Sequence, residues 1–138
     1  MVDNASLAAH CKLMLTTMIQ VALGGAIGAA LRFLTGVGIL RFVGSSFPVA
    51  ILGINVLGSL LMGMFVVFAA HRGLTQLNPF VLTGLLGGFT TFSAFSLEAV
   101  SLFERGVFGL AVLYVSLSVG LSIGGLVLGL IIARGIWA

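Results

Sequence analysis

Four long apolar stretches dominate this chain and constrain what it can fold into. They cover residues 13–38, 48–70, 79–103 and 107–133. An α-helix rises about 1.5 Å per residue and the hydrocarbon core of a bilayer is about 30 Å thick, so each stretch is long enough to cross a membrane. Charged residues make up only 7% of the 138 residues, too few to cover a soluble domain. The sequence therefore predicts one all-α integral membrane domain of four transmembrane helices.

The basic residues are few and lie far apart along the chain. The formal net charge is +3, but single cations between apolar stretches cannot follow the phosphates of a nucleic acid. With four spans, the basic residues divide almost evenly between the two sides of the membrane: Lys12, Arg72 and Arg134 on one, and Arg41 and Arg105, with Arg32 nearby, on the other. Such a balance sets no orientation by the positive-inside rule. It fits chance, and it also fits a chain that inserts in both orientations and pairs antiparallel with itself.

Small residues recur four positions apart in three of the four stretches. The pairs are Gly24 and Gly28, Ser59 and Gly63, Gly120 and Gly124, and Gly125 and Gly129. Such pairs let helix backbones approach closely in lipid. Packing within one chain explains any single pair, but four helices of this size have little room to enclose an ion path alone. We therefore expect a homo-oligomer.

The third apolar stretch contains an unusual polar segment near its middle. Gly87 and Gly88 lower the helix propensity there, and the hydroxyls of Thr90, Thr91 and Ser93 can compete for backbone groups. We therefore expect a break in the third helix, between Gly87 and Thr91. Backbone groups freed at membrane depth persist only where they line a cavity or bind something. Freed carbonyls suit a hard cation such as Na⁺, and freed amides suit an anion.

Aromatic and hydroxyl side chains offer candidates for an ion path. Phe92 and Phe95 are three residues apart and can share a helix face, where the positive edges of their rings could contact an anion. Core packing is the alternative for both rings. Tyr114, Ser118 and Ser122 form one polar stripe on the fourth helix, although serine hydroxyls often bond back to their own helix.

Three further polar side chains interrupt the apolar stretches. Asn55 lies in the second stretch, where an unpaired amide is costly, so it either joins two helices or lines a path. Arg32 and Glu98 are ionisable residues that carry a role or lie near helix ends and reach water. The sequence has no cluster of His, Cys and carboxylate residues of a catalytic or zinc-binding kind. We therefore do not expect an enzyme.

The segment with the expected break resembles the third-helix signature of the Fluc family of bacterial fluoride channels. Residues 87–98 read GGFTTFSAFSLE, and the family pattern is GGxTTFSTFSxE. Residues 24–32 read GGAIGAALR, similar to the family's first-helix GGxxGAxxR. Asn55 followed by Gly58 also matches, as does Arg105–Gly106 before the fourth helix. The resemblance covers nearly the whole chain after the first dozen residues.

The resemblance implies a fluoride-selective channel that passively exports fluoride across the bacterial cytoplasmic (inner) membrane and so lowers cytoplasmic fluoride. It implies an antiparallel, dual-topology homodimer in lipid, with a structural Na⁺ at the dimer centre held by the main-chain carbonyls of Gly87 and Thr90. Arg32 and Glu98 also match family positions, without a defined task. The implied fluoride pathway comprises Asn55, Phe92, Phe95, Tyr114, Ser118 and Ser122.

The sequence departs from the family pattern at two places, and two rival functions are compatible with its composition. Ala94 stands where threonine or serine is common, which removes a hydroxyl beside the phenylalanines. Residues 50–54, AILGI, precede Asn55 where a Gly-Thr pair is usual.

One rival function is that of a small dual-topology multidrug or cation exporter, which needs an intramembrane carboxylate for proton exchange; here Glu98 lies in the wrong helix for that class. The other is a non-transporting membrane assembly subunit.

Overall fold

The structure, a computed structural model, describes residues 4–43 and 47–137, and every regular element within these ranges is helical. Two long helices come first: α1 (Asn4–Val43) and α2 (Val49–His71). A short 3₁₀ turn, η1 (Thr75–Leu77), leads into the third span, which consists of the π-helix η2 (Pro79–Leu86), α3 (Gly87–Phe89) and α4 (Phe92–Glu104). The chain ends with α5 (Phe108–Trp137).

Four segments of the described chain are long and apolar enough to cross a membrane, which confirms the predicted number of spans. They are His10–Val43, Val49–His71, Thr75–Glu104 and Phe108–Trp137. The first helix is longer than the predicted stretch at both ends; residues 44–46 of the loop predicted after it lie outside the described residues. A cation in the last turn is favourable for a helix, and Arg41 lies there. The helix therefore does not need to end where the apolar stretch ends.

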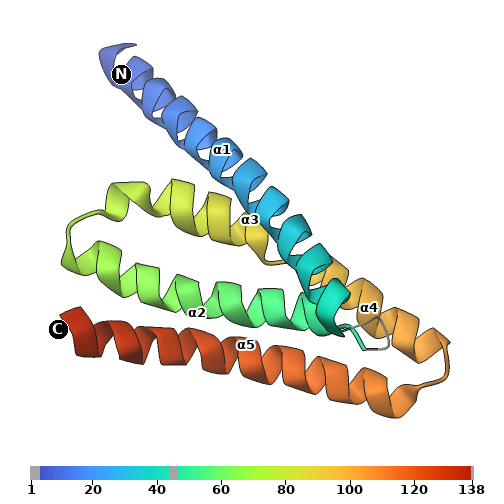
Figure 1. The fold of residues 1–138 in the computed structure, drawn as a ribbon. Helices are drawn as coiled ribbons and strands as arrows, with labels where there is room; N and C mark the ends of the chain where they lie inside the picture. Colours follow the sequence, from blue (N-terminus) through green and yellow to red (C-terminus); the bar gives the residue numbers. More distant parts are fainter. Residues whose placement is uncertain (1–3, 44–46, 138) are drawn as a thin grey trace.

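The helices pack as two groups. In one group, α2 and α5 lie side by side and run in the same direction, with α4 against α5; in the other, α1 packs on η2 and α3 (Figure 1). At 40 residues, α1 is about 60 Å long, roughly twice the thickness of a hydrocarbon core. Its N-terminal part accordingly extends beyond the other helices (Figure 1).

Glycines make the close contacts within each group. A Cβ on Gly28 would overlap the Leu85 carbonyl of η2, and a Cβ on Gly129 would overlap the Leu60 carbonyl of α2. Close backbone approach through small residues is the usual way that helices associate in lipid. Of the glycine pairs noted in the sequence, only Gly120 and Gly124 both face open space, with no atom within 4 Å of an added Cβ. That pair does not hold the single chain together.

Candidate functional site

Two residues with extended backbone interrupt the third span. Thr90 has ψ of 158° and Thr91 has φ of −153° and ψ of 119°. We call Thr90 and Thr91 the extended pair. Before it, the Thr90 N–H still donates to the Leu86 carbonyl at 2.9 Å; after it, the Thr91 hydroxyl oxygen accepts from the Ala94 N–H at 3.2 Å. Thr91 therefore caps the start of α4, as threonine commonly does at a helix N-terminus.

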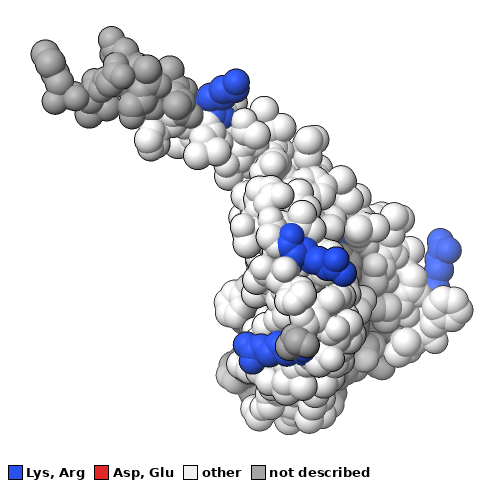
Figure 2. Space-filling view, turned by 90° about the vertical axis from the view of Figure 1, so that its left-hand side faces the viewer, with Lys and Arg blue, Asp and Glu red and all other residues white. Residues whose placement is uncertain are grey.

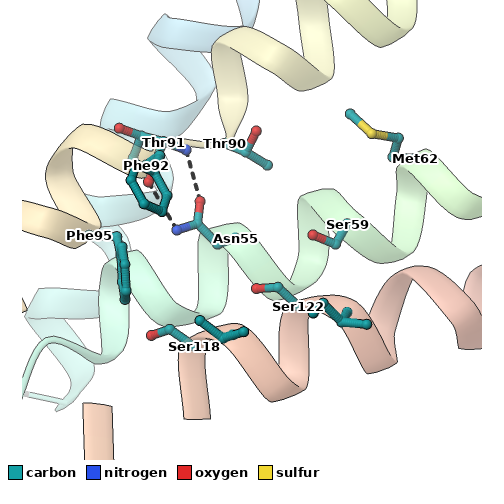
Figure 3. A pocket seen from close by; sticks show the side chains of 11 residues that line it. Asn55, Ser59, Met62, Thr90, Thr91, Phe92, Phe95, Ser118 and Ser122 are labelled. Carbon is teal, nitrogen blue, oxygen red and sulfur yellow. Dashed lines mark hydrogen bonds between the residues drawn. The ribbon is translucent and has the colours of Figure 1, made fainter. Parts of the chain in front are cut away.

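The side-chain amide of Asn55 binds the extended pair from the neighbouring helix α2. The Thr91 N–H donates to Asn55 Oδ1 at 2.8 Å, and Asn55 Nδ2 donates to the Thr91 carbonyl at 3.1 Å. Figure 3 shows both bonds as dashed lines. An unpaired backbone group at this depth would be costly. One asparagine thus satisfies both backbone polar groups of a residue that has left the helix.

Because of these hydrogen bonds, two main-chain carbonyls lack the N–H donors that they would have in a regular helix. In an uninterrupted helix, the Thr91 N–H would bond to the carbonyl of Gly87, and the Ala94 N–H to the carbonyl of Thr90. Here the first N–H binds Asn55 and the second binds the Thr91 hydroxyl. The carbonyls of Gly87 and Thr90 therefore lose their helical donors. Gly87 itself is helical, so the interruption starts three residues later than the predicted 87–91 segment.

A pocket of about 280 Å³ lies beside the extended pair. Its lining contains no charged residue and combines amide, hydroxyl, aromatic and aliphatic groups from α2, α4, α5 and the extended pair (Figure 3). The lining residues are Asn55, Ser59, Met62, Thr90, Thr91, Phe92, Phe95, Ser118, Val119, Ser122 and Ile123. Phe92 at its edge is 77% exposed. One chain therefore leaves this pocket open on one side.

Aromatic rings form a continuous row from the pocket into the core. The Phe92 and Phe95 ring centroids are 5.3 Å apart, and those of Phe95 and Tyr114 are 5.5 Å apart. Phe47 meets Tyr114 edge-on at 5.8 Å. Phe95 thus lies between the pocket and Tyr114, which is fully buried. The rings of Phe92 and Phe95 are held by aromatic contacts, and both also line the pocket.

Two buried hydroxyls near the pocket have no hydrogen-bond partner among the described residues. They are the Tyr114 OH and the Ser118 Oγ. The two hydroxyls lie one helical turn apart, close enough for a weak mutual hydrogen-bonding interaction, but their geometry falls short of a full hydrogen bond. A buried hydroxyl normally finds a partner. Of the two, the Ser118 hydroxyl belongs to the pocket lining, so it is the O–H donor that a guest in the pocket can reach.

The structure brings most of the predicted site residues together, but not all of them. Asn55, Phe92, Phe95, Ser118 and Ser122 line one pocket with Thr90. Tyr114 lies behind Phe95 and outside the lining. Arg32 on α1 and Glu98 on α4 are half-buried and do not line the pocket either.

Sequence reasoning missed five lining residues. Ser59, noted only as a small packing residue, lies one turn after Asn55 and so shares its helix face, a spacing that could have identified it. Val119 and Ile123 each follow a lining serine. Met62 and Thr91 complete the set. The described residues hold no group of three or more His, Cys, Asp or Glu side chains that could bind a metal.

Comparison with known proteins gives consistent matches over most of the chain. The family model described as CrcB-like protein, Camphor Resistance (CrcB), matches residues 19–130. A protein of Ruegeria sp. named fluoride-specific ion channel FluC is 67% identical over 124 residues, which cover 89% of this chain and 98% of the relative. The protein of the same name in Roseobacter denitrificans is 65% identical over 123 residues, covering 88% and 98%. That of Agrobacterium fabrum is 46% identical over 119 residues, covering 85% and 95%. These names describe ion channels and not enzymes.

Replacing Asn55 with alanine is expected to loosen the extended pair, because both backbone groups of Thr91 lose their partners. Each lost bond that leaves a buried group unsatisfied costs about 1–3 kcal/mol. Hydrogen–deuterium exchange of a peptide covering residues 87–95 should become faster in the Asn55→Ala variant. Ser59→Ala, one turn away on the same helix face, is the matched control and should leave the exchange unchanged. Equal exchange in both variants would show that Asn55 does not hold the extended pair.

Proposed function

This chain belongs to the CrcB-like protein family, and on that premise we propose that it is a fluoride-selective channel that passively exports fluoride across the bacterial cytoplasmic membrane. The observation that carries the proposal is the 67% identity to a relative named as a fluoride-specific ion channel, in an alignment that covers 98% of the relative's length. The four membrane spans fit this function. Passive conduction needs no catalytic residue, only a path that an ion can enter and leave.

The chemistry of the pocket supports a small anion as the guest. The O–H group of Ser118, which lines the pocket, has no partner among the described residues and can donate. The edges of the Phe92 and Phe95 rings carry positive partial charge. In a low-dielectric site, such neutral donors act more strongly than they do in water. Because the lining has no lysine or arginine, an anion would be stabilised without being held by a full opposite charge, as conduction requires.

The same pocket gives no support to a proton-coupled exporter of cations. Such a protein needs a carboxylate where the substrate binds. The lining contains none, and Glu98 lies outside it. An ion path built from neutral donors favours the channel.

The active form in this proposal is an antiparallel, dual-topology homodimer embedded in lipid. The pocket is open on one side and Phe92 is 77% exposed, so the site of a single chain is incomplete. The Gly120–Gly124 pair on α5 faces open space and offers a surface for close helix contact. The nearly even division of basic residues between the two membrane sides is compatible with insertion in both orientations.

We further propose a structural Na⁺ at the dimer centre, bound by main-chain carbonyls of Gly87 and Thr90 from each subunit. The fit rests on the hydrogen bonds of this region, because both carbonyls lose their helical donors to Asn55 and to the Thr91 side chain. Uncharged oxygens are suitable ligands for a hard monovalent cation. When bound, the ion would supply positive charge that holds the interrupted third spans together.

Fluoride flux from liposomes tests the proposed function directly. The purified protein should release trapped fluoride, measured with a fluoride electrode, and should not release chloride. Phe92→Ile and Phe95→Ile should each slow the release by about tenfold, which is about 1.4 kcal/mol and close to the most that an oriented aromatic contact contributes.

The matched control for these variants is Phe103→Ile. Phe103 packs against Phe108 at the turn between α4 and α5, with ring centroids 4.9 Å apart, and it does not line the pocket. Its flux should stay at the wild-type rate. A wild-type protein that releases no fluoride would refute the channel, and unchanged flux in both pocket variants would assign their rings to packing alone.

The topology is testable with the native cysteine. Cys11 is the single cysteine of the chain and is exposed near the N-terminal end of α1. A membrane-impermeant maleimide added to intact spheroplasts should label about half of the amount that becomes labelled after permeabilisation, because half of the chains place this end outside. Labelling of all or none of the protein before permeabilisation would contradict dual topology.

Removing Na⁺ should destabilise the dimer. A ligand at 100 times its dissociation constant stabilises the bound state by about 2.7 kcal/mol. Thermal unfolding in detergent should therefore occur at a lower temperature in N-methyl-D-glucamine chloride than in sodium chloride at equal ionic strength. The fraction of dimer, measured by light scattering, should fall as well. An unchanged unfolding temperature and dimer fraction would argue against the cation.

A further inference from the structure

The C-terminal ends of α2 and α5 lie together at one end of the molecule and enclose a groove. Because the two helices run in the same direction, their last turns are neighbours (Figure 1). The groove has a volume of about 470 Å³. We call it the terminal groove; its lining residues are Val66, Val67, Ala70, His71, Leu130, Arg134 and Trp137. It is apolar along its length and basic at its end.

Among the described residues, the charged side chains at this end of the molecule are basic. Arg134 lies in the last turn of α5, His71 ends α2, and Arg72 follows directly. The acidic residues of the described chain, Glu98 and Glu104, are both on α4, which lies toward the opposite end of the molecule (Figure 1). Figure 2 views the end with the groove, where the coloured surface shows basic side chains and no acidic one. Among the described residues, no carboxylate therefore opposes an anion that approaches the groove.

Trp137 forms one wall of the groove and marks its depth in the membrane. Its ring packs against Phe68 of α2, with centroids 5.2 Å apart and planes inclined by 59°. Tryptophan is enriched at the level of the lipid headgroups, where its ring is in an apolar layer and its N–H meets polar groups. With Trp137 at this level, Arg134 would lie near the headgroups, and Val66 and Val67 would lie toward the membrane interior.

A simpler explanation accounts for the charges but not for the groove. Cations in the last turn of a helix interact favourably with the helix dipole, and an arginine near a helix end can reach water. Neither effect requires a hollow between α2 and α5 with valine and leucine walls directly below the cations. A phospholipid has the matching arrangement, with an anionic phosphate above an acyl chain.

We propose that the terminal groove binds an anionic phospholipid, with its phosphate at Arg134 and His71 and an acyl chain along Val66, Val67 and Leu130. One basic side chain near a headgroup is expected to enrich anionic lipid about fivefold. The proposal requires only that the chain spans a membrane and does not depend on fluoride conduction. In an antiparallel dimer, each leaflet would hold one such site.

The single tryptophan of the chain makes the groove directly observable. Full-length protein is reconstituted in phosphatidylcholine bilayers that contain a small, equal fraction of dibrominated phosphatidylglycerol or dibrominated phosphatidylcholine. Bromine quenches the fluorescence of a neighbouring indole. The brominated phosphatidylglycerol should quench Trp137 as strongly as about five times its concentration of brominated phosphatidylcholine. Equal quenching by the two lipids would overturn the proposal.

Charge variants test which basic residue produces the preference for the anionic lipid. Arg134→Gln should bring the ratio of quenching by phosphatidylglycerol to quenching by phosphatidylcholine close to one. Arg134→Lys, which keeps the positive charge, should keep most of the wild-type preference. Arg105→Gln, at the turn on the opposite end of α5, is the matched control and should keep the wild-type ratio. A preference that survives Arg134→Gln, or is lost equally in Arg105→Gln, would show that the groove does not select the lipid. Absence of quenching by either lipid would show that lipid does not reach Trp137, which also overturns the proposal.

Discussion

The pairing between the Asn55 side chain and the backbone of Thr91 is the interaction on which the site depends. A transmembrane segment normally satisfies its own N–H and C=O groups, and an interruption leaves them unpaired in a medium without water. Asn55 supplies one acceptor and one donor in the spacing that a single extended residue needs, at 2.8 Å and 3.1 Å. Because these bonds come from α2, the interruption is fixed in position relative to the serines of α5. The pocket between them is then a stable feature of the fold.

The pocket itself shows how a membrane protein can present polarity without charge. Its polar groups are an amide, hydroxyls and aromatic edges, and its other walls are aliphatic. Full charges at this depth would carry a large desolvation cost, and a full positive charge would hold an anion too firmly to release it. Hydroxyls such as that of Ser118, buried and without a partner among the described residues, provide a moderate and directional attraction. The two phenylalanines add a weaker one.

The sequence predicts the spans because hydropathy depends only on local composition, and it predicts most of the pocket through motif resemblance. It does not predict the geometry that depends on distant parts of the chain. Asn55 and Thr91 are 36 positions apart, and no periodicity links them. The stripe of Tyr114, Ser118 and Ser122 is also less regular than its spacing indicates, because a helix advances about 100° per residue and residues eight apart differ by about 80° in direction. Ser118 and Ser122 consequently line the pocket, and Tyr114 turns behind Phe95. In the same way, spacing alone does not show that Gly125 and Gly129 contact α2 whereas Gly120 and Gly124 face outward.

The division of the helices into two packing groups has a mechanical consequence. The chain of the third span belongs to both groups, since η2 and α3 pack with α1 and α4 packs with α5. It changes from one group to the other at Thr90 and Thr91, the two residues with extended backbone, which both line the pocket. Because Asn55 of α2 holds Thr91, a displacement of one group against the other would act on the backbone of these two residues. Bilayer thickness and lateral pressure act on the outer surfaces of both groups, so a shift of one group against the other would reach the wall of the pocket at these residues.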